Sequence, residues 1–207
     1  MPSDGGSRIS TRRFSQPRNL HAGRGSAIDV HIDLCGQHAY AALVGGLGVR
    51  RECPDCGSIQ HGRPTVDGGH ISIAHAGDLH VVAHGGEPVG VDAEPDRQVE
   101  GIDAVALHRA ERAVLASLEG VARAAAILQV WVAKEAALKL TGTGLRTAPE
   151  TFVVRHPDGW YVEPGVIATR RIYVHRIPAE GSVIMLAGYQ PAPRLVVRRR
   201  NDPANLE

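Results

Sequence analysis

The sequence contains VARAAAILQVWVAKEAALKLTG at residues 121–142, and the apolar period of this stretch predicts a long helix that ends at its glycine. At 100° per residue, Ile127, Trp131 and Leu138 fall within about 40° of one another and define the face that packs on a core. Glu135 projects on the same apolar side. Burying an uncompensated charge has a large free-energy cost, so we expect this carboxylate to interact with a metal, a cationic partner or a hydrogen-bonded ligand.

Two lysines flank this apolar stripe, Lys134 beside Glu135 and Lys139 one turn further on. A local ion pair between Glu135 and Lys139 at spacing i, i+4 is the simplest interpretation, and it contributes only about 0.2–0.5 kcal/mol. That pair does not explain why the acid lies on the apolar side. The helix therefore offers one carboxylate between two bases.

A second pair of carboxylates lies in VGVDAE, residues 89–94, which is predicted to be a strand. Asp92 and Glu94 are two positions apart, so their side chains point to one face of the strand. A solvated strand end before Pro95 is one interpretation, and a shared hard cation is the other. With Glu135 and the two lysines, the set suits a pyrophosphate held through Mg²⁺, as in a phosphoryl or nucleotidyl transferase or a magnesium nuclease.

The rest of the chain alternates strand-like segments with a few helices, which predicts an α+β fold. Residues 191–207 contain Pro and several Arg and are expected to be a flexible tail. Helical patterns occur at 38–49 and 103–119 in addition to 121–140, and strand patterns occur at 27–34, 70–75, 79–84, 89–94, 151–154, 160–162, 166–174 and 182–189.

The charge of the chain is balanced, with Lys+Arg 23 against Asp+Glu 22 and a formal net charge of +1. No overall field attracts nucleic acid or an anionic membrane, so any phosphate-binding charge must be local. Residues 1–26 lack the apolar core of a secretory signal and are expected to be a disordered tail. No stretch approaches the roughly 18–20 apolar residues of a membrane span, and we expect a cytoplasmic protein.

Three cysteines are present, and Cys53 and Cys56 form a CxxC sequence. A structural zinc site needs about four ligands, and Cys35 and His61 are the plausible additions. The favoured interpretation is a reduced turn without metal, shaped by Pro54 and Gly57, and zinc binding is the alternative.

Several segments together resemble the Sfp-type 4′-phosphopantetheinyl transferase superfamily. GVDAE (90–94) and WVAKEAALK (131–139) are similar to its two signature motifs, GxDxE and WxxKExxxK, at a separation that also matches. CPDCGSIQHGRP (53–64), SIAHAG (72–77) and LHRAER (107–112) resemble further family segments. Each piece is weak alone, but the combination over residues 50–146 is specific.

The resemblance implies a monomer of two similar α+β halves with coenzyme A in the cleft between them. The expected division is a tail at 1–26, an N-terminal subdomain at 27–87, a C-terminal subdomain at 88–190 that carries the metal motifs, and the tail at 191–207. The implied reaction transfers the phosphopantetheine arm of coenzyme A to a serine of an acyl or peptidyl carrier protein, and adenosine 3′,5′-bisphosphate is released.

The resemblance also assigns roles to individual residues of this chain. Mg²⁺ would be held by Asp92, Glu94 and Glu135. Glu135 would also be the candidate base for the carrier serine, with Lys139 at the phosphates and Glu111 assisting. Binding of coenzyme A would involve Arg63, Pro64, His75, Lys134 and Lys139, with Arg63 and His75 at its 3′-phosphate.

Two alternatives remain open at the level of sequence. The carboxylates and lysines would equally suit a magnesium-dependent phosphohydrolase or nuclease. The region before Cys53 is short for the family and has no clear counterpart of its arginine-rich helix. This shortness leaves room for a non-catalytic protein that binds the carrier without modifying it.

Overall fold

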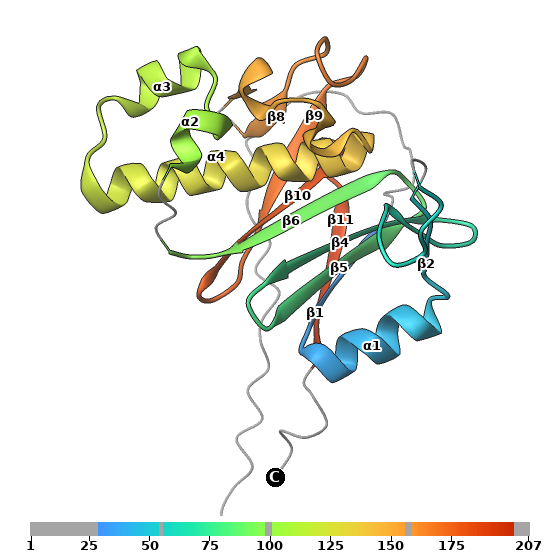
Figure 1. Ribbon diagram of the computed structural model, residues 1–207. Coiled ribbons are helices and arrows are strands. Elements are labelled where there is room, and N and C mark those ends of the chain that lie inside the picture. The colour runs from blue at the N-terminus through green and yellow to red at the C-terminus, as the bar shows by residue number, and fades with distance from the viewer. Residues whose placement is uncertain (1–28, 54–55, 98–100, 156–158, 201–207) are drawn as a thin grey trace, which may run out of the picture.

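Two β-sheets share an apolar core in the computed structural model, which describes residues 29–53, 56–97, 101–155 and 159–200 (Figure 1). The four-stranded sheet has the order β11-β1-β5-β4, and the five-stranded sheet has the order β6-β10-β9-β8-β7. The first sheet consists of β1 (Asp29–Cys35), β4 (His70–Ala76), β5 (Leu79–Gly85) and β11 (Arg194–Arg200). The second consists of β6 (Val89–Pro95), β7 (Val154–Arg155), β8 (Trp160–Val162), β9 (Ile172–Ile177) and β10 (Ser182–Gly188).

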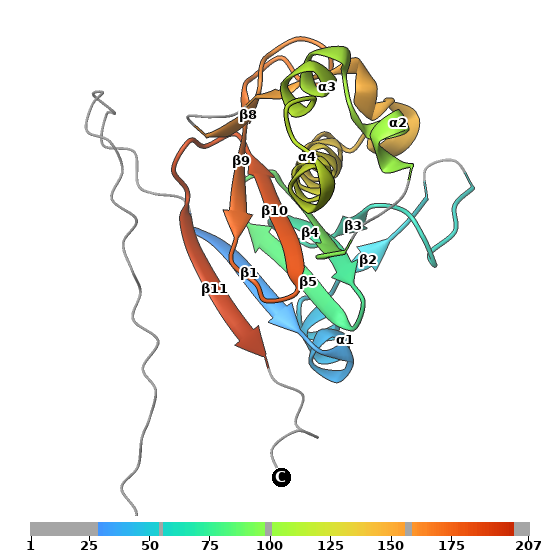
Figure 2. The same cartoon turned by 90° about the vertical axis from the view of Figure 1, so that its left-hand side faces the viewer.

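Helices cover the outer faces of the two sheets (Figure 2). Helix α1 (Gln37–Gly46) packs on the first sheet, and the long helix α4 (Gly120–Thr141) packs on the second. The two-residue period of the strands produces these layers: Ile71 and Ile73 of β4 point toward α1, whereas Ala74 and Ala76 point into the core between the sheets. The smaller elements are β2 (Arg50–Arg51), β3 (Pro64–Thr65), α2 (Ile102–Ala106), α3 (Arg109–Leu115), η1 (Gly144–Arg146) and η2 (Pro149–Thr151).

This architecture confirms the predicted α+β class. In each sheet, a first strand leads into a helix and then into a hairpin whose second strand pairs antiparallel with that first strand. The two sets are β1, α1, β4, β5 and β6, α4, β9, β10. The shared connectivity supports the expectation of two similar halves, and their pseudo-twofold relation stays a prediction.

The prediction of one continuous helix at 103–119 is wrong, because the chain forms the two short helices α2 and α3 there. His108 lies between them in extended conformation and caps α3. Its Nδ1 accepts a hydrogen bond from the Ala110 amide at 3.1 Å, and its own amide donates to the Glu111 carboxylate at 2.8 Å. Because these two capping hydrogen bonds need His108 outside the helix, the chain leaves the helical conformation at residues 107–108 although the apolar period continues there.

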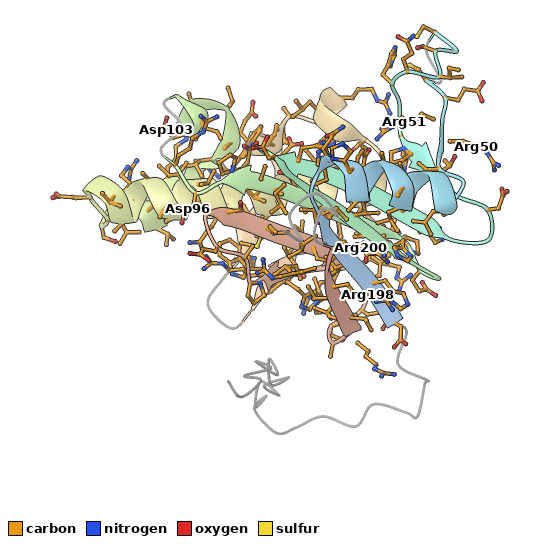
Figure 3. All side chains as sticks on the ribbon, turned by 90° about the horizontal axis from the view of Figure 1, so that it is seen from below. Arg50, Arg51, Asp96, Asp103, Arg198 and Arg200 are labelled. Atoms are coloured by element: carbon orange, nitrogen blue, oxygen red, sulfur yellow. The ribbon has the colours of Figure 1, made fainter. Side chains whose placement is uncertain are left out.

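The flexible tail expected at 191–207 is also wrong for residues 194–200, which form β11 and pair in parallel with β1. The Arg200 guanidinium donates to the buried Asp33 carboxylate at 2.7 Å, and Leu195 packs on the core between the sheets. Two arginines of this strand therefore have acidic partners on β1, Arg194 with Asp29 and Arg200 with Asp33, and Figure 3 shows Arg198 and Arg200 along the strand. The tail expected at residues 1–26 lies outside the described residues.

The described part of the chain contains no helix with both the length and the apolar character needed to cross a membrane.

Candidate active site

Helix α4 lies directly across β6, and Gly90 makes this close approach possible (Figure 1). A Cβ at Gly90 would meet the carbonyl oxygen of Ala136 and the amide of Leu140 far inside van der Waals contact. Any other residue at position 90 would therefore force helix α4 away from β6. As a result, the acidic end of β6 and the last turns of α4 lie against one another.

Asp92 of β6 and Lys139 of α4 meet at this crossing. The Lys139 ammonium donates to Asp92 Oδ1 at 2.7 Å and to the carbonyl oxygen of Ile73, on β4, at 3.3 Å. Asp92 is 7% exposed. Desolvation raises the pKa of its carboxyl, Lys139 opposes that shift, and the neighbouring Glu94 adds to it. One lysine thus joins both sheets to the helix.

Glu135, one turn before Lys139, is the second acid of the crossing and is half-buried. Desolvation raises the pKa of its carboxyl to about 7, with contributions from the charges of Asp92 and Glu94 and opposition from Lys139. Glu135 Oε1 and Asp92 Oδ2 are buried without a hydrogen-bond partner among the described residues. Two orphaned carboxylate oxygens beside a third acid are a fit for a hard divalent cation.

The three carboxylates are nevertheless spread more widely than a closed ligand set. Their oxygens do not all lie within 4.8 Å of one another. Among the described residues, the group that meets this spacing consists of Cys53, Cys56 and His61. Mg²⁺ usually takes one or two carboxylates and completes its shell with water and substrate phosphate. The wide spacing therefore agrees better with a metal shared with a phosphate ligand than with a dedicated protein cage.

The raised pKa of Glu135 has a measurable effect on stability. Because the folded state holds a proton that the unfolded state releases, folding stability falls as the pH rises from the ordinary carboxyl pKa of 4.5 to about 7 and then levels off. Glu135→Gln removes this titration. In urea unfolding without divalent cations, we expect the free energy of unfolding of the variant to rise relative to that of the parent protein as the pH increases across that window. A difference independent of pH would contradict this account, and Glu180→Gln, at an exposed position, is the control.

A basic cavity of about 630 Å³ adjoins the acidic crossing. It lies between the segments that carry β2 and β3, strand β4 and the end of α4, and Lys139 forms part of its wall. The Arg63 guanidinium lies against Gly142 and donates to the Leu140 carbonyl oxygen at 3.3 Å, so it also docks on the helix end. The basic side chains of the lining are Arg51, Arg63, Lys139 and Arg146. Such a cavity suits a ligand with several phosphate groups.

The other expected ligand residues near this cavity are Pro64 and His75. Pro64 lies in its wall, on β3. His75 is exposed on β4 and makes edge-to-face ring contacts with Tyr40 and His80. Desolvation lowers the pKa of His75, and His80, Lys139 and Arg51 lower it further. His75 therefore lies in the same positive field, as a neutral ring at neutral pH.

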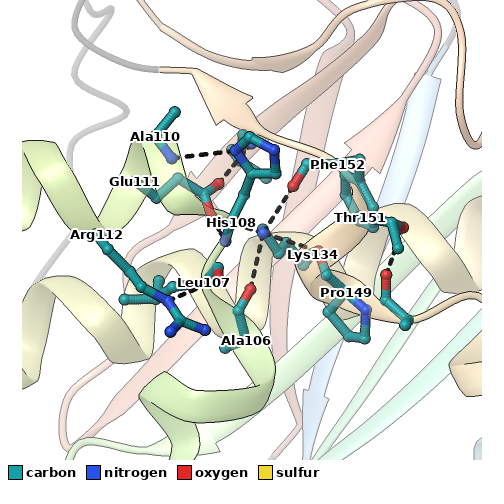
Figure 4. A network of polar contacts seen from close by, with 12 residues as sticks. Ala106, Leu107, His108, Ala110, Glu111, Arg112, Lys134, Pro149, Thr151 and Phe152 are labelled. Carbon is teal, nitrogen blue, oxygen red and sulfur yellow. Dashed lines mark hydrogen bonds and ion pairs between the residues drawn. The ribbon is translucent and has the colours of Figure 1, made fainter.

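Lys134 and Glu111 lie in a different place, outside the lining of the basic cavity, and the expectation that they serve ligand binding and catalysis stays a prediction. Lys134 is fully buried and pairs with Glu111 at 2.6 Å, and it projects about 140° away from Lys139 around α4. Its ammonium also donates to the carbonyl oxygens of Ala106, Pro149 and Phe152 at 2.8–2.9 Å (Figure 4).

The Glu111 carboxylate is equally engaged. Oε2 accepts the His108 amide, and Oε1 accepts the Val154 amide at 2.8 Å. Desolvation lowers the pKa of Lys134, and the Glu111 carboxylate opposes that shift. All the groups are satisfied inside the protein, so the pair fastens α3, α4 and the η2–β7 segment together.

Sequence reasoning missed Arg51, Arg146 and the packing role of Gly90. Gly90 stands in the GVDAE motif, but the need for a glycine follows from the helix that crosses the strand. Arg51 is half-buried on β2 and donates to the Gly62 carbonyl oxygen at 2.9 Å. Arg146 follows the glycine turn after α4 and donates to the Gly142 carbonyl oxygen at 3.1 Å. Neither arginine belongs to a periodic pattern, so only the fold places it at the cavity.

Comparison with known families gives one finding. Residues 88–178, which include β6, α4 and β9, match the family model of the 4′-phosphopantetheinyl transferase superfamily. No curated protein matches the chain in sequence.

Proposed function

Because residues 88–178 are a domain of the 4′-phosphopantetheinyl transferase superfamily, we propose that this protein transfers the phosphopantetheine arm of coenzyme A to a serine of an acyl or peptidyl carrier protein. The products are the holo-carrier and adenosine 3′,5′-bisphosphate. The observation that carries the proposal is the position of Lys139, which lines the basic cavity and also reaches the acidic crossing through Asp92. One side chain thus links a site for a phosphorylated ligand to a site for a cation.

In the proposed reaction, the serine oxygen of the carrier attacks the β-phosphorus of coenzyme A. The bond from that phosphorus to the bridging oxygen breaks, and the adenosine bisphosphate leaves with the electron pair. Asp92 and Glu135, with Glu94 beside them, would hold Mg²⁺, which when bound offsets the charge of the pyrophosphate. Lys139 would contact the same phosphates. Glu135 would also be the candidate to accept the serine proton directly or through a water molecule, because a cation bound beside it would keep its carboxylate ionised.

The basic cavity would hold the nucleotide end of coenzyme A. Arg51, Arg63 and Arg146 supply positive charge around it, and the guanidinium of Arg63 retains free N–H groups because it donates one hydrogen bond to Leu140. His75 stands at the edge of this field. In this assignment these arginines supply the positive charge that helix α1, which contains no Lys or Arg, does not.

The test is to incubate the protein with coenzyme A, Mg²⁺ and a panel of apo-carriers, and to look by mass spectrometry for the added arm. We expect modified carrier and adenosine 3′,5′-bisphosphate in equal amounts. Bisphosphate release without carrier would instead favour a phosphohydrolase. Carrier binding with no transfer in the whole panel would favour a non-catalytic binding protein. Either result would overturn the proposal.

Arg63 is expected to recognise the 3′-phosphate of coenzyme A. A charge-assisted hydrogen bond of this kind contributes about 1.5–3 kcal/mol, or roughly ten- to a hundredfold in binding. Arg63→Ala should therefore lower kcat/KM for coenzyme A by that factor and leave dephospho-coenzyme A nearly unchanged. Arg50→Ala is the matched control, because Arg50 is exposed and pairs with Asp67 outside the cavity. If the ratio between the two donors does not move in Arg63→Ala, Arg63 does not read this phosphate.

A further inference from the structure

The loop between β2 and β3 brings together three metal-ligating side chains that the proposed reaction does not use. The ligand atoms of Cys53, Cys56 and His61 all lie within 4.8 Å of one another. Cys56 Sγ and His61 Nε2 are 3.3 Å apart. None of the three cysteines forms a disulfide within the described residues, and Cys35 is buried in β1 outside this group. The third ligand is thus His61 rather than Cys35.

Backbone geometry holds the three side chains in this arrangement. The Gly57 amide donates to the Cys53 carbonyl oxygen at 2.8 Å, and the Cys53 amide donates to Ser58 at 2.9 Å. Gly57 has φ +70, which lets the chain reverse directly after Cys56. The loop therefore forms a tight turn around the position on which the two sulfur atoms converge.

Gly62 closes the loop on the other side. It has φ +108, and a Cβ there would lie 2.7 Å from the Glu52 carbonyl oxygen, so the two arms of the loop cross in direct backbone contact. Arg51 fastens this crossing through its hydrogen bond to the Gly62 carbonyl oxygen. The contact returns His61 to the side of Cys56, five positions along the chain.

We infer that Cys53, Cys56 and His61 bind a zinc ion. Two thiolates and an imidazole favour Zn²⁺ over Mg²⁺ or Ca²⁺, which prefer oxygen ligands. In a tetrahedral site with ordinary Zn–S and Zn–N bonds, sulfur and nitrogen ligands are about 3.5 Å apart, close to the spacing of Cys56 and His61. The fourth position is left to water or a small anion. This assignment favours the zinc alternative over the metal-free turn that the sequence favoured, because the structure brings His61, one of the two additional ligands considered, next to the cysteines.

The location of the site gives it a structural role. Cys53 is buried, and both Cys53 and Gly62 line the basic cavity next to Arg51 and Arg63. A zinc ion would close the loop whose two ends carry these arginines. One of its ligands, Cys53, lines the cavity, and all three ligands are distinct from Asp92, Glu94 and Glu135. Zinc here therefore positions cationic side chains and takes no direct part in phosphate transfer.

The test is elemental analysis of the full chain, expressed in zinc-supplemented medium and purified without chelator. We expect about one zinc ion per chain, against less than about 0.2 in Cys56→Ser and in His61→Ala. These two side chains are exposed, so both variants should keep the circular dichroism of the parent protein. Cys35→Ala and His38→Ala, whose side chains lie outside the group, are the matched thiol and imidazole controls and should retain the metal.

Cobalt substitution provides a second, independent measurement. Co²⁺ bound by two thiolates should give thiolate-to-metal charge-transfer absorption and the intense visible bands of a tetrahedral ion, both lost in Cys56→Ser. The inference is overturned if the parent protein has less than about 0.2 zinc and no thiolate–cobalt absorption. It is also overturned if the metal persists in both variants, or if mass spectrometry shows a Cys53–Cys56 disulfide in protein kept under reducing conditions. Neither measurement uses coenzyme A or a carrier, so its outcome is independent of the proposed reaction.

Discussion

Asp92→Ala and Glu135→Ala should each lower the rate of carrier modification by about 10²-fold or more, the scale of losing a major electrostatic contact in a transition state. Both side chains have a buried oxygen with no hydrogen-bond partner among the described residues, and both lie where α4 crosses β6. Glu94→Ala should follow the same trend. The measurement is kcat for holo-carrier formation at saturating coenzyme A and Mg²⁺.

The double variant distinguishes one shared site from separate contacts. If Asp92 and Glu135 act on the same cation, removing both should cost little more than removing one, because groups that act as a unit are non-additive. Independent few-fold losses that multiply would contradict a shared metal. Glu180→Ala, at an exposed position, should leave kcat unchanged and controls for a general loss of acidic charge.

Lys134→Met should destabilise the protein by about 3–5 kcal/mol in urea unfolding, because it leaves the buried carboxylate of Glu111 without its cationic partner. Lys134→Met combined with Glu111→Gln should recover part of this loss. The amide of glutamine carries no charge and keeps an acceptor oxygen for the backbone amides of His108 and Val154. A change of less than about 0.5 kcal/mol in the single variant would contradict a buried pair.

The same variant tests the role of Lys134 in ligand binding. Lys134 does not line the basic cavity, so the folded fraction of Lys134→Met should bind coenzyme A as tightly as the parent protein. Lys139→Met should instead weaken coenzyme A binding while costing less stability, because Lys139 is partly exposed in that wall. A reversed pattern for the two lysines would show that the assignments are exchanged.

The sequence predicted the elements whose signal is local. The alternation of apolar and polar residues predicted the hairpin β4–β5 and strand β6. The 3.6-residue apolar period predicted α4 and its end at Gly142. The face of Glu135 was also correct, because the side on which a helical residue projects follows from its spacing alone. Asp92 and Glu135 were expected to converge, and their electrostatic coupling is consistent with that.

What the sequence missed depends on contacts between distant segments. Lys134 and Lys139 look equivalent in a helical pattern, yet one is fully buried and the other borders a cavity, and only the position of η2 and α3 decides which. Arg194 and Arg200 of β11 resemble residues of a solvated tail until their acidic partners on β1, Asp29 and Asp33, are known. His61 was a plausible zinc ligand in the sequence beside Cys35, and only the fold, with its backbone crossing at Gly62, brings His61 and not Cys35 to the other two cysteines. In each case the missing information is the partner rather than the residue.

The pairing of β11 with β1 affects the order in which the protein can fold during synthesis. Asp29 pairs with Arg194, so the N-terminal sheet lacks one of its strands until residues 194–200 have left the ribosome. Until then β1 exposes an open edge, and closing so long a loop has an entropic cost that local contacts do not offset. The second sheet, whose strands lie between residues 89 and 188, does not wait for β11. Translation therefore favours assembly of the acidic crossing of β6 and α4 before completion of the sheet that borders the basic cavity.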